Sequence, residues 1–124
     1  MSLITIFEDD YLICVHKPNN MLVHHAHHSR NISDETSLLQ LIFKEKGLKV
    51  YPIHRLDRKT SGIILLAKET KYVSKFQDVF ITHEIQKIYF GVVRGFSPEI
   101  KIINSPVKGR DASVHKAAET HLKT

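Results

Sequence analysis

One short stretch carries most of the side chains that could do chemistry. Residues 51–62 run Tyr-Pro-Ile-His-Arg-Leu-Asp-Arg-Lys-Thr-Ser-Gly, which places one carboxylate between two guanidinium groups. If Arg55 and Asp57 lie in extended backbone, their side chains project to the same side. A cation that close favours the ionised form of a carboxyl group. The spacing therefore predicts that Asp57 is a charged carboxylate at neutral pH, able to act as a nucleophile or a base.

Two other interpretations of this stretch compete with catalysis. Clusters of His, Arg and Asp also occur as surface ion-pair loops without a function, and the stretch alone does not separate these two cases. The second alternative is the catalytic loop of protein kinases, in which His-Arg-Asp precedes an Asn. Here Leu56 separates Arg55 from Asp57, no Asp-Phe-Gly follows, and no glycine-rich phosphate loop precedes, so a kinase is rejected.

The segments around this stretch must hold it in place. Ile63–Ala67 is an unbroken apolar run, which predicts a central strand buried on both faces. Functional groups gain precision when they are mounted on such rigid elements. β-type patterns predict further strands, with a hairpin turn at residues 8–10 between the first two: Leu3–Phe7, Tyr11–His16, Ile85–Val93 and Glu99–Ile103, and one more beginning in Lys116–Thr124.

Two helices are predicted from apolar periodicity. The first begins near Ser33–Glu35, ends at Gly47 and carries an apolar stripe that we expect in the core: Leu38, Leu39, Leu41, Ile42 and Phe43. The second is capped by Thr70 and presents an apolar stripe that we expect in the core: Tyr72, Val73, Phe76, Val79 and Phe80. The fold class is therefore α+β, with a mixed, mainly antiparallel sheet and two packed helices.

Composition sets broad limits. A length of 124 residues implies one domain, and no apolar run approaches a membrane span. The acidic start predicts no secretion signal. The lone Cys14 excludes an internal disulfide framework and fits a reducing cytoplasm, where we expect the protein. The chain has 18 Lys and Arg residues and 13 Asp and Glu residues, a net charge of +5. This moderate excess is only weak support for a nucleic-acid partner.

Four histidines fall within residues 24–28, a composition that invites a metal site. Zinc ligand sets normally combine separated pairs with Cys, Asp or Glu. We therefore expect an exposed loop here and no metal.

The stretch 54–62, His-Arg-Leu-Asp-Arg-Lys-Thr-Ser-Gly, resembles the signature loop of the RluA family of RNA pseudouridine synthases, His-Arg-Leu-Asp-x-x-Thr-Ser-Gly, at every fixed position. Val15–Pro18 and Met21–His24 resemble the family's early segment, although Asn20 stands where a Gly is usual. Gln86–Tyr89 through Val93–Gly95 resembles its Lys-x-Tyr strand. The closest segments are those of bacterial members acting on tRNA. Residues 1–124 are expected to be the N-terminal part of one catalytic domain.

The resemblance implies an isomerase that converts uridine to pseudouridine in structured RNA, with tRNA a more probable partner than ribosomal RNA and no membrane partner. Asp57 is the implied catalytic carboxylate, whether it adds to the ribose, adds to the base or removes a sugar proton. Tyr89, which shares a strand face with Lys87, packs against the target base. No cofactor is needed. Basic residues predicted to contact RNA are Arg55, which enters the space of the flipped base, and Arg58, Lys59, Lys87, Arg94, Lys108 and Arg110.

A second half of the family's domain is not in this sequence. That half carries a Gly-Arg-x-His-Gln-x-Arg segment, which supplies a second arginine facing the catalytic Asp. Half a sheet leaves an open strand edge and exposed apolar surface. The chain is therefore expected to be a fragment that self-associates through that edge or folds incompletely. A truncated, catalytically inactive RNA-binding fragment and a mere folding unit are the alternatives to an enzyme.

Overall fold

The structure is a computed structural model that describes residues 2–25, 36–82, 84–108 and 115–123. The chain divides into two units, Met1–Lys87 and Ile88–Thr124, and each is described by itself. In the described residues, no helix is long and apolar enough to cross a membrane.

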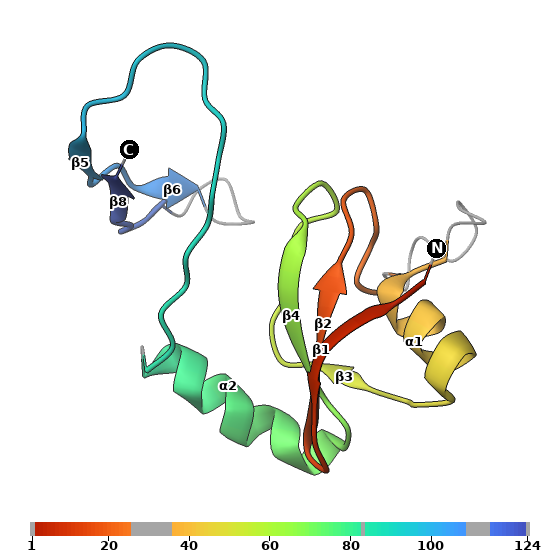
Figure 1. The fold of residues 1–124 in the computed structure, drawn as a ribbon. Coiled ribbons are helices and arrows are strands. Elements are labelled where there is room, and N and C mark those ends of the chain that lie inside the picture. Colours follow the sequence, from red (N-terminus) through yellow and green to blue (C-terminus); the bar gives the residue numbers. More distant parts are fainter. Residues whose placement is uncertain (1, 26–35, 83, 109–114, 124) are drawn as a thin grey trace. The chain divides into compact units, whose positions relative to one another are not determined.

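The first unit contains a four-stranded antiparallel sheet in the order β1-β2-β4-β3 (Figure 1). Its strands are β1 (Ile4–Glu8), β2 (Leu12–Lys17), β3 (Tyr51–Pro52) and β4 (Gly62–Ala67). The predicted hairpin between β1 and β2 is confirmed. Asp9 shapes its turn, because Oδ1 of this residue accepts the N–H groups of Tyr11 and Leu12, both at 2.8 Å.

Helix α1 (Leu38–Lys46) is delimited by signals at both ends. The Ser37 hydroxyl accepts the Gln40 N–H and the Gln40 side chain accepts the Ser37 N–H, which forms a capping box. The expected start at residues 33–35 lies outside the described residues. The predicted stop is confirmed, since Gly47 takes the left-handed conformation at φ 67° and its N–H donates to the Phe43 carbonyl.

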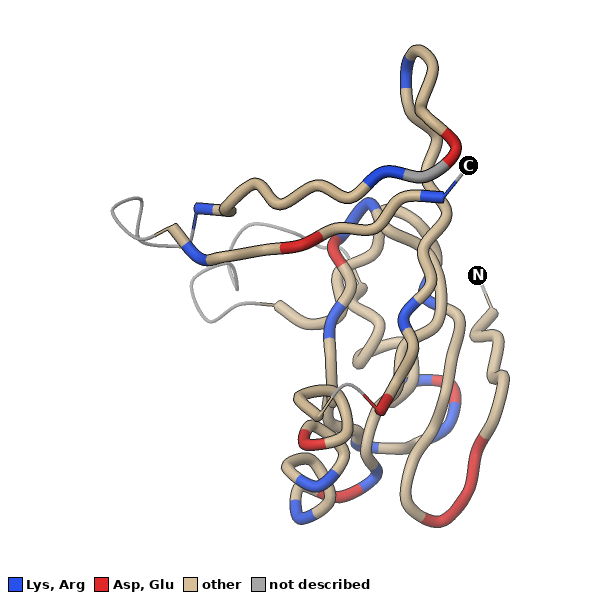
Figure 2. The backbone as a smooth tube through the Cα atoms, turned by 90° about the vertical axis from the view of Figure 1, so that its left-hand side faces the viewer, with Lys and Arg blue, Asp and Glu red and all other residues tan. Residues whose placement is uncertain are grey.

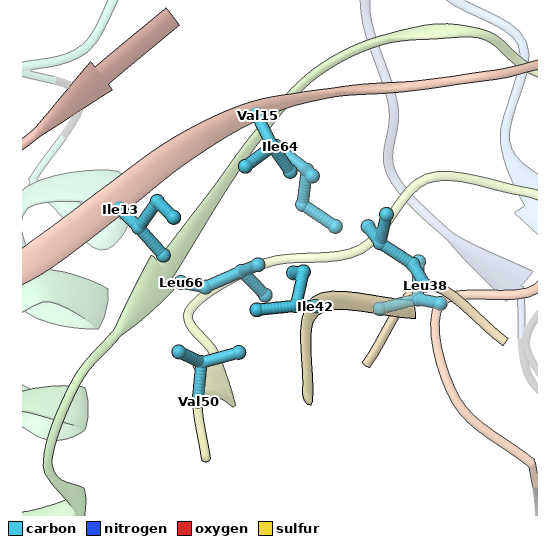
Figure 3. Packing of buried hydrophobic residues seen from close by; sticks show 8 residues of the cluster. Ile13, Val15, Leu38, Ile42, Val50, Ile64 and Leu66 are labelled. Carbon is cyan, nitrogen blue, oxygen red and sulfur yellow. The ribbon is translucent and has the colours of Figure 1, made fainter. Parts of the chain in front are cut away.

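The hydrophobic core lies between α1 and one face of the sheet (Figure 3). Alternate residues of β2 and β4 point to this face, because Ile13 pairs with Leu66 and Val15 pairs with Ile64. Helix α1 contributes Leu38 and Ile42, which are fully buried. The cluster is Ile13, Val15, Val23, Leu38, Ile42, Val50, Ile64 and Leu66.

The prediction that residues 63–67 are buried on both faces is wrong. β4 is central, as expected, with β2 on one side and β3 on the other. Ile63, however, is 59% exposed, because α1 covers only the face to which Ile64 and Leu66 point. An apolar run does not by itself show that both faces of a strand are covered.

Helix α2 (Val73–Ile81) follows a single 3₁₀ turn, η2 (Thr70–Tyr72). Thr70 therefore lies inside this turn and is not the predicted cap. The five residues of the predicted stripe do share one face, but each is only half-buried, so that α2 has no buried residue. The contacts that hold this segment include edge-on packing of Tyr72 in η2 against Tyr11, at 5.3 Å between ring centres, and a hydrogen bond from Gln77 Nε2 in α2 to the Ile53 carbonyl at 3.2 Å.

The second unit contains two short antiparallel ladders. β5 (Ile100–Ile103) pairs with β8 (Thr120–Lys123), and β6 (Val107–Lys108) pairs with β7 (His115–Lys116). The strands expected in Glu99–Ile103 and Lys116–Thr124 are thus confirmed.

The predicted strand Ile85–Val93 is wrong: the described residues of this segment form no strand. Side chains of this segment are exposed: Ile88 to 68%, and Phe90 and Val92 fully. β-branched and aromatic residues favour a strand only where a neighbouring strand pairs with them, and these residues have no such neighbour among the described residues.

Candidate functional site

At the start of the loop that carries Asp57, a side chain replaces the main chain as a hydrogen-bond partner of β4. β3 ends at Pro52, and the Ile53 N–H still donates to the Leu65 carbonyl at 3.3 Å. The Leu65 N–H instead donates to Nε2 of His54 at 3.0 Å. The His54 ring also packs against Phe80 of α2, with 4.9 Å between ring centres. His54 therefore anchors the start of the loop to both β4 and α2.

This anchor requires a neutral imidazole, because only an unprotonated Nε2 can accept the Leu65 N–H. Burial lowers the pKa of His54 below its ordinary value, and the charge of Lys87 lowers it further, while a hydrogen bond with the Arg55 main chain partly opposes this. The sequence prediction gave His54 no role of its own.

Side chains alternate along the next residues of the loop. Leu56 is buried, whereas Arg55 and Asp57 on either side of it are exposed. Arg55 and Asp57 are thus both exposed, one on either side of the buried Leu56. A turn follows, in which the Thr60 N–H donates to the Asp57 carbonyl at 3.1 Å. The Asp57 carboxylate thus lies at the start of a tight turn and directly follows the buried Leu56.

Lys17, at the end of β2, is the charged residue that sequence reasoning missed. It is fully buried, and its ammonium donates to the carbonyls of Pro18 at 3.0 Å, Met21 at 2.8 Å and Arg58 at 3.1 Å. Burial lowers the pKa of Lys17, while the negative charge of Asp57 opposes that shift. One buried ammonium therefore joins the loop after β2 to the Asp57 turn and supplies a positive charge near the carboxylate.

A second contact joins the same two loops. Arg58 Nε donates to Oδ1 of Asn20 at 3.0 Å. Asn20 has a positive φ of 61°, a conformation that Gly and Asn adopt most readily. The Gly that the sequence resemblance leads us to expect at this position can adopt the same conformation.

The remaining predicted basic residues that the structure describes are exposed, and no recorded contact between described residues brings them together. Lys59 and Lys87 belong to the first unit, and Arg94 and Lys108 to the second. Arg110 lies outside the described residues. Lys and Arg positions are spread over both units and are interspersed with acidic positions (Figure 2). Tyr89 belongs to the second unit and is 64% exposed.

A pocket of about 410 Å³ adjoins the loop on the side of Arg55. Asp57 is not among its lining residues, which are His24, Leu39, Pro52, Ile53, His54, Arg55 and Gln77. The Asp57 carboxylate is therefore outside this pocket.

The histidine-rich segment is described only at its start. His24 is exposed, and the ring of His25 hydrogen-bonds to Gln40 Oε1 at 3.2 Å. His27 and His28 lie outside the described residues. Across the part of the chain that the structure describes, no three His, Cys, Asp or Glu side chains gather as a metal site would require.

Known proteins provide an independent comparison. A family profile described as RNA pseudouridylate synthase matches residues 11–124. The tRNA pseudouridine synthase C of Vibrio cholerae is 34% identical over 103 residues, which cover 83% of this chain and 41% of that protein. The protein of the same name from Pasteurella multocida is 37% identical over 108 residues, or 87% of this chain and 44% of that protein. This chain therefore spans less than half the length of these relatives.

A solved structure has a similar fold. The chain described as Human RNA Pseudouridylate Synthase Domain Containing 4 matches with a TM-score of 0.64 at 21% sequence identity. The match covers 95% of this chain and 52% of that one. At this level of identity the similarity concerns the fold alone.

Proposed function

Because this chain belongs to the RNA pseudouridylate synthase family, we propose that it carries the carboxylate-bearing part of an enzyme that isomerises uridine to pseudouridine in structured RNA. The observation that carries the proposal is that Asp57 is exposed while its neighbours in the loop are held in place. Leu56 beside it is buried, and the turn that follows is bonded to the buried ammonium of Lys17. A carboxylate held in this way is preorganised for attack or proton transfer.

The proposed reaction is balanced without an external oxidant or reductant. The N1–C1′ bond of the uridine breaks, a C5–C1′ bond forms, the C5 proton leaves and N1 gains a proton. The Asp57 carboxylate either adds covalently to C1′ or C6, which divides one difficult step into two, or removes a proton from the sugar. The ring of Tyr89 packs against the target base and assists proton transfer.

A uridine inside stacked RNA must leave the stack before Asp57 can reach it, at a cost of a few kcal/mol. Arg55, which is exposed as Asp57 is, enters the vacated space, because a planar guanidinium stacks well on bases. The side chains that contact RNA phosphates are Arg58, Lys59, Lys87 and Arg94. All of these side chains are exposed, which supports this assignment.

tRNA is the proposed substrate, because the curated relatives named above are tRNA pseudouridine synthases C. We propose that the two units are parts of one catalytic domain and that the protein acts in the cytoplasm, where the buried, unpaired Cys14 thiol stays reduced. Self-association is proposed as well. The exposed side chains of Phe90, Val92 and Phe96 support it, since a second copy can pair with this unpaired segment.

The test of the enzymatic proposal is tritium release from [5-³H]uridine-labelled tRNA, because C5 loses its hydrogen only if the new bond forms there. We expect release by this chain or by a longer chain that continues it, and none after Asp57→Ala. Asp10→Ala is the matched control, since Asp10 is an exposed acid in the β1–β2 turn. Release by neither chain rejects the proposal.

A second candidate function, RNA binding without isomerisation, is favoured by the exposed basic residues and by the partial coverage of the relatives. A filter-binding salt titration tests it. True phosphate contacts give an affinity that falls steeply with salt concentration and that survives Asp57→Ala. An affinity that does not change with salt rejects this candidate too.

A further inference from the structure

Two loops far apart in the sequence are tied together beside Asp57. The loop after β2 reaches the Asp57 turn through the main chain, because Lys17 Nζ donates to the Arg58 carbonyl at 3.1 Å. It reaches the same turn through side chains, because Arg58 Nε donates to Asn20 Oδ1 at 3.0 Å. Both ties end on Arg58, the residue next to Asp57. The position of the carboxylate therefore depends on how firmly Arg58 is held.

Asn20 contributes something that a glycine cannot. Its φ of 61° is equally available to glycine, so the backbone of this loop does not require a side chain here. A glycine, however, has no acceptor for the guanidinium of Arg58. The hydrogen bond between Arg58 and Asn20 is thus a feature of this chain that the backbone conformation does not explain.

We propose that Asn20 and Arg58 form a latch that positions Asp57, so that Arg58 acts as a positioning residue for the carboxylate. The role of Asp57 itself rests on the function proposed above. Besides the latch, the Thr60 N–H bond to the Asp57 carbonyl at 3.1 Å and the Lys17 bond to the Arg58 carbonyl at 3.1 Å hold this turn. Exposed turns of this kind open locally at low free-energy cost, and a charge-assisted hydrogen bond opposes that opening.

The first experiment measures the turn directly by amide hydrogen exchange in NMR spectra, without RNA. Asn20→Gly keeps the backbone conformation and removes the acceptor, whereas Asn20→Asp keeps an acceptor. The quantity compared is the exchange rate of the Thr60 amide divided by that of Gly47, whose N–H bonds to Phe43 in α1. We expect this ratio to rise about tenfold in Asn20→Gly and to return to the wild-type value in Asn20→Asp.

The partner of the latch is tested in the same way. In an Arg58→Met background, the change Asn20→Gly should have no further effect on the ratio, because its partner is already absent. An unchanged ratio in Asn20→Gly, or a full tenfold rise in the Arg58→Met background, overturns the latch. Neither outcome depends on whether the chain acts on RNA.

The second experiment connects the latch to the reaction. In the tritium-release assay we expect Asn20→Gly to lower kcat with little change in KM, and Asn20→Asp to restore kcat. A loss of general stability alone does not produce this pattern at a temperature where all variants are folded. An unchanged kcat in Asn20→Gly overturns the positioning role. If the wild-type chain and its longer form release no tritium, the proposed function fails, while the exchange result still decides the latch.

Discussion

Leu66 of β4 is fully buried beneath α1, whereas Leu122 of β8 is 37% exposed, although both lie in paired antiparallel strands. The first unit has a helix that covers one face of a four-stranded sheet. The second unit has two-stranded ladders, and none of its described residues is buried. Two-stranded ladders are marginal in water without a covering layer. From this difference we expect the sheet covered by α1 to be more stable than the two-stranded ladders.

The largest expected effect tests this comparison with one substitution in both units. Leu66→Ala should lower the free energy of unfolding by about 2–5 kcal/mol, because it removes buried methyl groups and leaves a cavity. Leu122→Ala should cost less than about 1 kcal/mol. Urea denaturation followed by circular dichroism measures both. Equal losses would show that the second unit has a core of its own, against the comparison.

The next largest effect concerns the charged group inside the first unit. Lys17→Met should cost about 1–3 kcal/mol, because three carbonyl groups lose their donor. Lys59→Met is the matched control, because Lys59 is an exposed lysine in the turn after Asp57. Its free energy of unfolding should stay within about 0.5 kcal/mol of wild type. A stabilised Lys17→Met variant, measured by the same denaturation, is the outcome that contradicts a structural role for the ammonium.

A pH dependence distinguishes the histidines of the two units. The folded state binds a proton at His54 less readily than the unfolded chain does, because burial lowers the pKa of His54 from its ordinary 6.5. The stabilising contribution of His54 is therefore fully present above about pH 6.5 and is lost as the pH falls below it. The melting temperature should fall between about pH 7.5 and pH 5.5.

Variants assign that pH dependence. His54→Gln should flatten the dependence in this range, whereas His115→Gln, at an exposed position of β7, should leave it unchanged. A melting temperature whose pH dependence is the same in wild type and His54→Gln speaks against His54 as its source.

The smallest effect concerns ion pairs. Glu8 accepts from Lys46 at 2.8 Å and from Lys68 at 2.9 Å, and these hydrogen bonds lower the pKa of Glu8. Its contribution is present above its ordinary pKa of 4.5 and is lost as the pH falls through the lowered value. Glu8→Gln should cost about 0–1 kcal/mol at neutral pH.

The matching pair in the second unit is Glu119 with His121, in which both side chains are more than half exposed. Glu119→Gln should therefore have no measurable effect on chemical denaturation. A larger effect from Glu119→Gln than from Glu8→Gln reverses the order of the two units.

Local patterns predicted much of the first unit. The β1–β2 hairpin, the end of α1 at Gly47 and the outward direction of Arg55 and Asp57 all follow from residue types over a few positions. Each of these features is determined by local chemistry: turn side chains, a left-handed cap and alternation around the buried Leu56.

The failures concern features that depend on distant parts of the chain. A lysine at the end of a strand is normally exposed, so Lys17 gave no sign of burial; the three carbonyls that hold it come partly from the Asp57 turn. Residues 85–93 include many β-branched and aromatic residues, which favour strands, but these residue types do not provide a neighbouring strand to pair with. Ile63 was expected to be buried because an apolar run does not reveal which face is covered.

The most direct measurement of the central claim is the nucleoside composition of tRNA after incubation with this chain and with a longer chain that continues it. The account predicts that digestion releases a new nucleoside with the mass of uridine and a different retention time, formed with wild type and Asp10→Ala but not with Asp57→Ala. Formation of that isomer by the Asp57→Ala variant, or its absence with both wild-type chains, contradicts the account.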